Sequence, residues 1–224
     1  MKQKFIPTLY YYEHCPYCIR VLVFAGLAGI ELKYRVLPND DEATPIQMIG
    51  KKMLPILQTA ANVFLSESLD IIAYLSRVYH HPVTVNSSLI RQVEKFLSEN
   101  RLLIYKLEMP RWVDMPYKEF ATESARNYFI GKKSKTIGSF DLALKKTPVF
   151  SRQLSEALNE KSELFEILTT QLHSYAAIQL FSGLYGIATV KDFNWPAPAG
   201  EFMQAMMQQS NIVKEPPQNA HFGK

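Results

Sequence analysis

The spacing of apolar residues divides the chain into two parts of different character. In residues 1–80, short β-branched or aromatic runs alternate with helical stripes. Strands are expected over residues 8–12, 32–37, 53–57 and 63–65, and helices over 19–28, 44–50 and 66–79. The first two strands enclose a helix and should be parallel, because a crossover of this length gives a right-handed βαβ unit. The last two should pair antiparallel, so this part is predicted to be an α/β domain of order βαβ-α-ββα.

After residue 88 the apolar spacing is helical, and no alternation typical of strands appears. Helices are expected over residues 89–106, 122–133, 151–172, 174–185 and 200–209. An irregular turn packed by Trp112 is expected over residues 109–116, and a loose tail after residue 214. The pattern therefore predicts a first domain at residues 1–80, a linker at 81–88 and an all-helical domain at 89–224.

The first helix of the N-terminal part, expected over residues 19–28, begins beside the only two cysteines of the chain, Cys15 and Cys18. Pro16 takes the first helical position, where a missing N–H group costs nothing. A thiol at a helix N-terminus faces unpaired N–H groups and the positive end of the helix dipole, which favour the thiolate. Cys18 lies one turn further along, close enough to attack a disulfide formed by Cys15. The spacing is therefore typical of thiol–disulfide exchange.

Three other interpretations of the cysteine pair stay open at this point. A structural zinc site needs four ligands, and the spacing of the histidines at positions 14, 80, 81, 173 and 221 does not match such sites. A structural disulfide would close a very small loop and add little stability, since the gain grows with loop length. Two inert, buried cysteines are the third alternative. We favour the redox interpretation.

Composition and charge narrow the class of protein. The chain has 224 residues, of which 47% are hydrophobic and 21% charged, as in ordinary globular proteins. No apolar run approaches the roughly 18–20 residues of a membrane span, and the N-terminus lacks the apolar stretch of a signal peptide. Two cysteines without an export signal indicate a reducing cytoplasm. The net charge of +4 is too modest to indicate nucleic-acid binding, so we expect neither nucleic acid nor membrane as a partner.

Two further positions permit both an ordinary and a functional interpretation. Pro55 precedes an apolar strand, and from the sequence alone an ordinary trans proline is favoured, because only about 5–6% of such bonds are cis. A cis bond would leave the Leu54 backbone free to pair with a peptide-like ligand. Glu67 and Ser68 open the next helix, where capping alone would explain them.

Taken together, these motifs resemble the glutaredoxins. The likeness is carried by Cys15-Pro16-Tyr17-Cys18, by Leu54-Pro55 and by Glu67-Ser68 followed by Asp70. It extends to the large two-domain bacterial glutaredoxins of the second type, which are built like glutathione transferases. The wider likeness is found in residues 12–18, 39–45, 125–129, 178–181 and 194–196. It implies a thioredoxin-like N-terminal domain followed by an all-α glutathione-transferase-like C-terminal domain.

The resemblance also implies roles for individual residues. Cys15 would be the nucleophile and Cys18 the resolving thiol. The residues implied for glutathione binding are Tyr17, Lys52, Leu54, Pro55, Glu67 and Ser68. Among them, Leu54 would pair through its backbone beside a cis proline, and the γ-glutamyl end would lie at the N-terminus of a helix. Lys52 would meet the glycyl carboxylate, with Lys51 as the alternative.

The activity implied is that of a glutathione-dependent thiol–disulfide oxidoreductase that reduces protein or glutathione mixed disulfides. One alternative is a cysteine-type glutathione transferase or dehydroascorbate reductase, against which Cys18 argues because such enzymes need one thiol. A second is a non-catalytic glutathione- or protein-binding module on the same scaffold. We expect glutathione as a co-substrate, no permanent cofactor or metal, disulfide-containing or glutathionylated proteins as partners, and a monomer.

One position departs from the pattern of transferase-like domains. Their core helix usually opens with a capping box, in which an Asp stands three residues after the cap. Here Ser174 is followed by Ala177 at that position. The missing reciprocal cap is expected to weaken the helix start by about 0.5–1 kcal/mol, which affects folding and leaves the chemistry unchanged.

Overall fold

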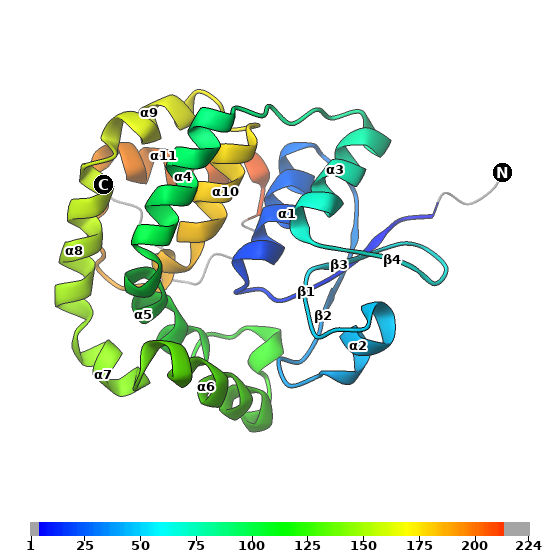
Figure 1. The fold of residues 1–224 in the computed structure, drawn as a ribbon, viewed down its shortest axis with the longest axis horizontal. Helices are drawn as coiled ribbons and strands as arrows, with labels where there is room; N and C mark the ends of the chain where they lie inside the picture. The colour runs from blue at the N-terminus through cyan, green and yellow to red at the C-terminus, as the bar shows by residue number, and fades with distance from the viewer. Residues whose placement is uncertain (1–4, 213–224) are drawn as a thin grey trace.

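A four-stranded mixed sheet forms the centre of the N-terminal lobe in the computed structural model, which describes residues 5–212 (Figure 1). The strands are β1 (Thr8–Tyr11), β2 (Lys33–Val36), β3 (Ile56–Ala60) and β4 (Val63–Ser66), in the order β2-β1-β3-β4. β1 runs parallel to β2 and antiparallel to β3, so that Leu9 is paired with both Tyr34 and Leu57. β4 completes the sheet antiparallel to β3.

Three helices cover this sheet: α1 (Pro16–Leu27), α2 (Ala43–Ile49) and α3 (Ser68–Tyr79). Figure 1 shows α1 and α3 beside each other on one side of the sheet and α2 on the other side. The predicted order βαβ-α-ββα is confirmed. Helical spacing predicts that Leu69 shares the apolar face of α3 with Ile72 and Leu75, but Leu69 is 48% exposed, so this detail is wrong. The buried face is centred on Ile71, Ile72 and Leu75, and Leu69 lies about 110° from its middle around the helix.

The C-terminal lobe is helical throughout, as predicted. Its helices are α4 (Ser87–Glu99), α5 (Arg101–Trp112), η1 (Lys118–Phe120), α6 (Glu123–Ile137), α7 (Phe140–Lys145), α8 (Thr147–Asn159), α9 (Ser162–Thr169), α10 (Tyr175–Leu184), η2 (Tyr185–Thr189) and α11 (Ala197–Ser210), where η marks a 3₁₀-helix. Among its described residues no strand occurs beyond an isolated bridge between Thr84 and Ser174. The tail after residue 214 lies outside the described residues.

Several helix boundaries in this lobe differ from the prediction. The helix expected over 89–106 starts at Ser87, where Asn86 caps it, and is broken at Asn100, whose side-chain amide donates to the Phe96 carbonyl. The irregular turn expected over 109–116 is confirmed for residues 113–116 and wrong for 109–112, because α5 continues to Trp112. Pro110 has no N–H to donate to the carbonyl four residues earlier, and it lies in the last turn of α5, two residues before the helix ends.

The helix expected over 151–172 is two helices, α8 and α9, separated by residues 160–161. The short helix α7 was missed, because six residues are too few for a clear apolar period. At the start of α10, the Ser174 hydroxyl accepts the N–H of Ala177 at 3.2 Å. The forward half of the capping box is therefore present, and Ala177 has no side-chain group with which to complete it.

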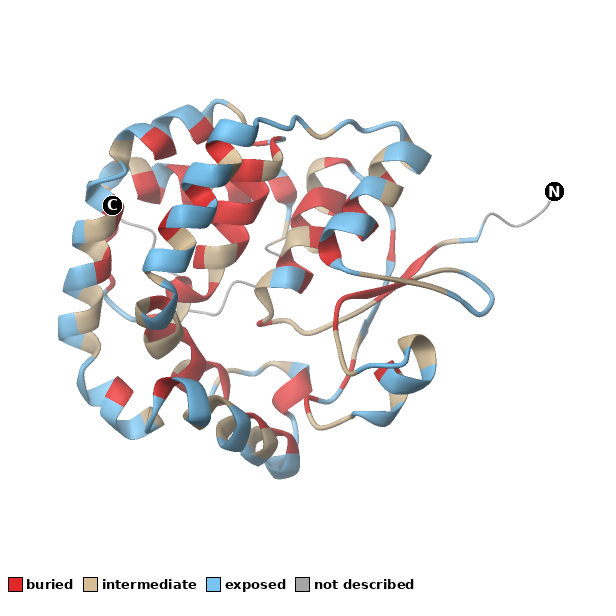
Figure 2. Ribbon diagram, in the orientation of Figure 1, coloured by how far each residue is buried: buried red, intermediate tan, exposed pale blue. Residues whose placement is uncertain are grey.

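The two lobes share one hydrophobic core. Its buried members include Leu9 and Phe24 from the first lobe and Phe181 and Phe202 from the second. The buried residues, red in Figure 2, are concentrated on α1 and α10, where the lobes meet, and α1 also contacts α11. Because the core is continuous, the division into domains at residues 80 and 89 stays a prediction.

Glu108 is a charged residue inside the C-terminal lobe. Its side chain on α5 is 1% exposed, and neither carboxyl oxygen makes a hydrogen bond within the described part of the chain. Burial raises the pKa of Glu108 well above its ordinary value, and the nearby Gly186 backbone amide offsets only part of this effect. The folded protein therefore holds this carboxyl in its neutral form to a higher pH than the unfolded chain does.

We expect Glu108→Met to stabilise the protein by about 1–3 kcal/mol, because it removes a buried carboxyl for which the nearby Gly186 amide offsets only part of the cost of burial, and it keeps the length of the side chain. The gain should grow as the pH rises from the ordinary carboxyl range, since a raised pKa in the fold means that stability is lost on deprotonation. Urea unfolding at pH 5 and pH 8 measures both effects. Glu108→Gln is the control: its side chain stays polar, so the gain from removing a polar group should be absent, but it does not titrate, so the dependence of stability on pH should be lost. A methionine variant less stable than wild type at both pH values would contradict the expectation.

Candidate active site

The two cysteines lie where the sequence placed them, at the end of β1 and the start of α1. Cys15 is the N-cap residue of α1, with extended backbone angles, and Pro16 is the first helical residue. Both thiols are free; Cys15 is partly exposed and Cys18 is fully buried. The buried sulfur of Cys18 accepts the backbone N–H of Tyr12 at 3.4 Å. One thiol therefore faces solvent, and the second lies one turn behind it.

The two thiols have pKa values shifted in opposite directions. The pKa of Cys15 is lowered to about 6, first by a hydrogen bond from the Cys18 thiol and then by the positive charge of His14 and backbone N–H groups at the helix start, against the opposing effect of burial. Burial raises the pKa of Cys18 well above its usual value, and the neighbouring Cys15 adds to the shift. At neutral pH Cys15 is therefore a thiolate and Cys18 a thiol. The helix terminus predicted the lowered pKa of Cys15, whereas the contribution of the Cys18 thiol and the raised pKa of Cys18 were not predicted.

The Leu54–Pro55 peptide bond is cis, as the resemblance implied. Leu54 is buried in a small apolar cluster with Cys18 and Ile56, and Cys15 packs against the same cluster. The backbone that leads into β3 therefore lies beside both thiols. Of the predicted glutathione residues, Leu54 shares this cluster with both cysteines, and Pro55 follows it in the chain.

Glu67 and Ser68 lie at the start of α3, and neither acts there as an ordinary cap. Glu67 is the N-cap residue but, among the described residues, its side chain accepts no N–H from the first turn. It extends instead toward Lys51, whose amino group is 3.3 Å from its carboxylate, with both side chains more than half exposed. The backbone of Glu67 has a φ of 69°, which is uncommon for a residue other than glycine.

Tyr17 and Lys52, the other two residues implied for glutathione binding, contact different parts of the protein. Tyr17 is 54% exposed between the two cysteines in sequence, with the Arg20 guanidinium 4.8 Å from its ring centroid. The Lys52 amino group donates to the carbonyl of Asn39 and lies 4.0 Å from the ring centroid of Tyr128 on α6. Lys52 is therefore engaged where the two lobes meet, whereas Lys51 lies beside Glu67.

Sequence reasoning missed the contact between the active-site loop and η1. Glu119 is fully buried, and its Oε1 atom accepts both the backbone N–H of His14, at 3.0 Å, and an N–H from His14 Nδ1, at 2.7 Å. The carboxylate of Glu13 accepts the backbone N–H of Lys118 at 2.7 Å. The partners are separated by 105 residues, and no local pattern around Glu119 indicates this pairing.

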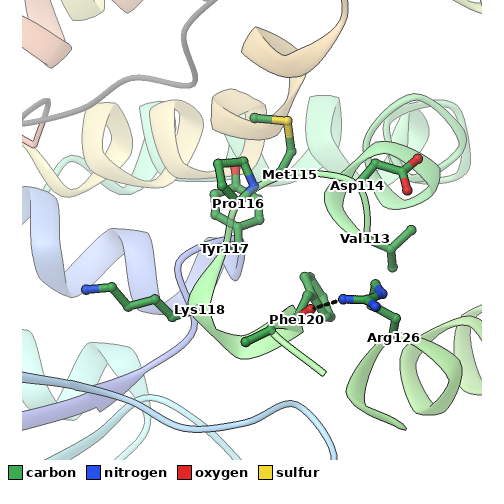
Figure 3. Close-up of a pocket in the computed structure, with 9 residues that line it drawn as sticks. Val113, Asp114, Met115, Pro116, Tyr117, Lys118, Phe120 and Arg126 are labelled. Carbon is green, nitrogen blue, oxygen red and sulfur yellow. Dashed lines mark hydrogen bonds between the residues drawn. The ribbon is translucent and has the colours of Figure 1, made fainter. Parts of the chain in front are cut away.

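The segment that makes these contacts also forms one wall of a hollow of about 490 Å³ (Figure 3). The residues that line it are Val113, Asp114, Met115, Pro116, Tyr117, Lys118, Phe120, Ala121 and Arg126. Arg126 donates to the carbonyl of Phe120 at 2.6 Å and so ties η1 to α6. Neither cysteine is among these residues, so the reactive sulfurs lie outside this hollow.

Residues 5–212 contain neither a metal-binding cluster nor a membrane-spanning helix. Within residues 5–212, no three side chains of His, Cys, Asp or Glu are grouped so that they could hold a metal ion. Among the helices of the same range, none combines the length and apolar character needed to cross a bilayer.

A Cys-x-x-Cys pair at a helix start, beside a cis proline in a four-stranded mixed sheet, defines the thiol–disulfide oxidoreductases of the thioredoxin-like class. The second lobe has the architecture of glutathione transferases, as a transferase from Phanerochaete chrysosporium shows with a TM-score of 0.66 at 13% identity, covering 94% of this chain and 98% of that one. The family model of the Glutaredoxin 2 C-terminal domain matches residues 92–213, and that of the glutathione S-transferase N-terminal domain matches residues 9–82. The chain belongs to the Glutaredoxin 2 family.

Two relatives support this assignment. Glutaredoxin 2 of Escherichia coli K12 is 32% identical over 207 residues, which cover 91% of this chain and 95% of that protein. The crystal structure of Glutaredoxin 2 from Salmonella typhimurium, in complex with glutathione, has a TM-score of 0.87 at 31% identity and covers 96% of this chain and 99% of that one. The resemblance and the fold class predicted from the sequence are confirmed. The chain is thus a glutathione-dependent thiol oxidoreductase, and the single-cysteine transferase alternative is not favoured.

Proposed function

We propose that Cys15 is the nucleophile of this oxidoreductase and Cys18 its resolving thiol. The observation that carries the assignment is the pair of opposite pKa shifts on adjacent turns of one helix. In the first step the Cys15 thiolate attacks a substrate disulfide. A mixed disulfide forms on Cys15, and the other substrate sulfur leaves as a thiolate that takes up a proton.

Two routes then return Cys15 to its thiolate form. With a protein disulfide, Cys18 loses its proton and attacks the Cys15 sulfur, which releases the second substrate thiol and leaves a Cys15–Cys18 disulfide. Two glutathione molecules reduce this disulfide and become glutathione disulfide. With a glutathionylated protein, Cys15 takes the glutathione and releases the protein thiol. A second glutathione thiolate then attacks the mixed disulfide, which also yields glutathione disulfide.

Glutathione binds, in this proposal, in an extended form between the start of β3 and the start of α3. Its cysteinyl backbone pairs with Leu54 next to Pro55, which brings its sulfur to Cys15. Its γ-glutamyl end lies on Glu67 and Ser68, at the N-terminus of α3, which favours a carboxylate. Three observations support the placement: Leu54 packs in the apolar cluster against which Cys15 lies, Glu67 makes no cap within the described residues, and Glu67 has a positive φ.

The glycyl end of glutathione is assigned to the lysine pair. We propose Lys52 for its carboxylate, with Lys51 as the alternative, and Tyr17 as an exposed ring beside the bound tripeptide. Both amino groups already have partners, because Lys52 bonds to Asn39 and Lys51 pairs with Glu67. Separate replacement of each lysine by Met, with measurement of the KM for glutathione, distinguishes the two.

The partners proposed are disulfide-containing and glutathionylated proteins, in a reducing cytoplasm. A thiolate with a pKa near 6 suits such a compartment because it stays reactive at neutral pH. The chain is proposed to act as a monomer, with no permanent cofactor. The direct test of the function is reduction of β-hydroxyethyl disulfide by glutathione. Absence of turnover with the intact protein would refute it.

Replacing Glu67 and Ser68 together by Ala is expected to raise the KM for glutathione about tenfold, because two hydrogen-bonding groups are lost from its γ-glutamyl end. The pKa of Cys15 should stay near 6, since neither residue is among the groups that shift it. Steady-state kinetics and thiolate absorbance at 240 nm measure the two quantities. The matched control replaces Ser162 and Glu163 at the start of α9, a pair of the same kinds in the other lobe. If both double variants lose stability and neither changes the KM, Glu67 and Ser68 have only a structural role.

A further inference from the structure

The residue before the nucleophile is held by a residue of the helical lobe. Glu119 Oε1 accepts two hydrogen bonds from His14, one from its backbone N–H and one from its ring Nδ1. The ring is 7% exposed and the carboxylate is fully buried, so water competes with neither bond. These contacts fix both the path of the loop and the direction in which the imidazole points.

Aromatic rings surround this histidine on several sides. The centroid of the His14 ring lies 4.7 Å from that of Trp112, 5.0 Å from that of Phe120 and 5.5 Å from that of Tyr12, with which it stacks. One position earlier, Glu13 is bonded to the backbone of Lys118. Two consecutive residues before Cys15 are therefore clamped by two consecutive residues of η1.

The charges of this contact act on the thiol next to it. A buried carboxylate is stabilised by a positive partner, and a carboxylate in contact with an imidazole favours its charged form. The positive charge of His14 is among the influences that lower the pKa of Cys15. The other titratable groups that face this region are Glu13, whose pKa is raised by burial and by the neighbouring Glu119, Tyr11, Tyr12 and Cys18 on the same strand, loop and helix, and Tyr117 beside η1. Within the described residues, the second oxygen of Glu119 accepts no hydrogen bond, so His14 supplies both of the N–H groups that this carboxylate accepts.

We propose that Glu119 is a positioning residue for the reaction: through His14 it fixes the loop that presents Cys15 and places a carboxylate against the imidazole beside the reacting sulfur. The helical lobe thereby completes the active site of the other lobe. The inference rests on the proposed role of Cys15 as nucleophile. It assigns to Glu119 a task that concerns neither glutathione binding nor the resolving thiol.

The test is the pH dependence of Cys15 alkylation by iodoacetamide in the full-length Glu119→Gln protein. Glutamine has nearly the same shape, and its amide oxygen accepts the same two hydrogen bonds, but it carries no charge. We expect Cys15 to react about three- to tenfold more slowly than in wild type at pH 6, because less thiolate is present. At pH 9, where the thiolate is complete in both proteins, the rates should be equal. Mass spectrometry of peptides identifies which cysteine has reacted.

Two further variants keep the test decisive. Glu108→Gln alters another buried carboxyl of the same lobe, on a different element, and should leave the alkylation profile unchanged. His14→Phe keeps a ring among the aromatic neighbours but removes the bond to Glu119, and it should show the same slower reaction at pH 6. It provides the answer if Glu119→Gln does not fold. Combining the two changes should add little to either alone, because they remove one interaction.

Three outcomes would overturn the inference. Glu119→Gln could react as fast as wild type at pH 6, or faster. It could be slowed equally at pH 6 and pH 9, which would indicate a merely structural role. His14→Phe could react like wild type at both pH values. A different result refutes the proposed function itself: alkylation of Cys18 before Cys15 in the wild-type protein.

Discussion

Cys15→Ser is expected to abolish every disulfide reduction by this protein, because a serine hydroxyl is not ionised at neutral pH and cannot form the mixed disulfide. The loss should exceed about a thousandfold with β-hydroxyethyl disulfide and with a glutathionylated protein alike. The variant should fold normally, since the thiol lies at the partly exposed start of α1 and its replacement is nearly isosteric. Circular dichroism and a glutathione-coupled assay check the two statements.

Cys18→Ser should separate the two routes of the reaction. Reduction of a protein disulfide should fall strongly, because the resolving thiol is gone, while reduction of a glutathionylated protein should continue with free glutathione. The serine hydroxyl can still donate to the Cys15 sulfur, so the pKa of Cys15 should stay low. Cys18→Ala lacks that donor and should raise the pKa of Cys15, because the hydrogen bond from Cys18 is the largest influence that lowers this pKa. Equal loss of both activities in Cys15→Ser and Cys18→Ser would contradict the division of roles.

Gly26→Ala is expected to destabilise the protein by about 3 kcal/mol or more, the upper part of the range for overpacked cores. A Cβ atom at Gly26 would lie 1.7 Å from the carbonyl oxygen of Ser210 and 2.7 Å from its carbonyl carbon. Both are backbone atoms, so they cannot turn aside as a side chain could. α11 would have to move away from α1, and the shared core would open between them.

The control for this change is Gly131→Ala on α6. An added Cβ there meets no described atom within 4 Å, so alanine should be neutral or should stabilise the helix by up to about 1 kcal/mol. Urea unfolding followed by circular dichroism compares the two variants. If Gly26→Ala proves as stable as Gly131→Ala, α1 and α11 do not pack as closely as described.

The N-terminal lobe was predictable because its signals are local. Short aromatic and β-branched runs, separated by polar turns, give the strands, and the Cys15-Pro16 step marks the start of a helix. In the helical lobe the same reasoning identified most helices but misplaced their ends. Asn100 interrupts a continuous apolar pattern through a side-chain hydrogen bond, and Pro110 lies inside a helix that sequence rules would end before it.

The residues of the active site also differ in how far the sequence alone predicts them. The cysteines and the start of α3 are visible in short motifs, because helix starts impose local residue preferences. Glu119 is not visible, since it lies in a three-residue 3₁₀-helix whose neighbours show no period. Its contact with His14 depends on how the second lobe docks against the first. Such a contact depends on tertiary packing, which one sequence without a structure does not reveal.

The packing of α1 has a consequence for synthesis of the chain on the ribosome. This helix, which carries both cysteines, contacts α10 and α11, with Arg20 bonded to Ser182 and Gly26 against Ser210. Translation delivers α1 (Pro16–Leu27) well before α10 (Tyr175–Leu184) and α11 (Ala197–Ser210). During elongation one face of α1 therefore lacks its partners, and exposed apolar surface of this kind is prone to aggregation and is bound by chaperones. The helix that presents the reactive thiol acquires its final surroundings only when α11 has been made.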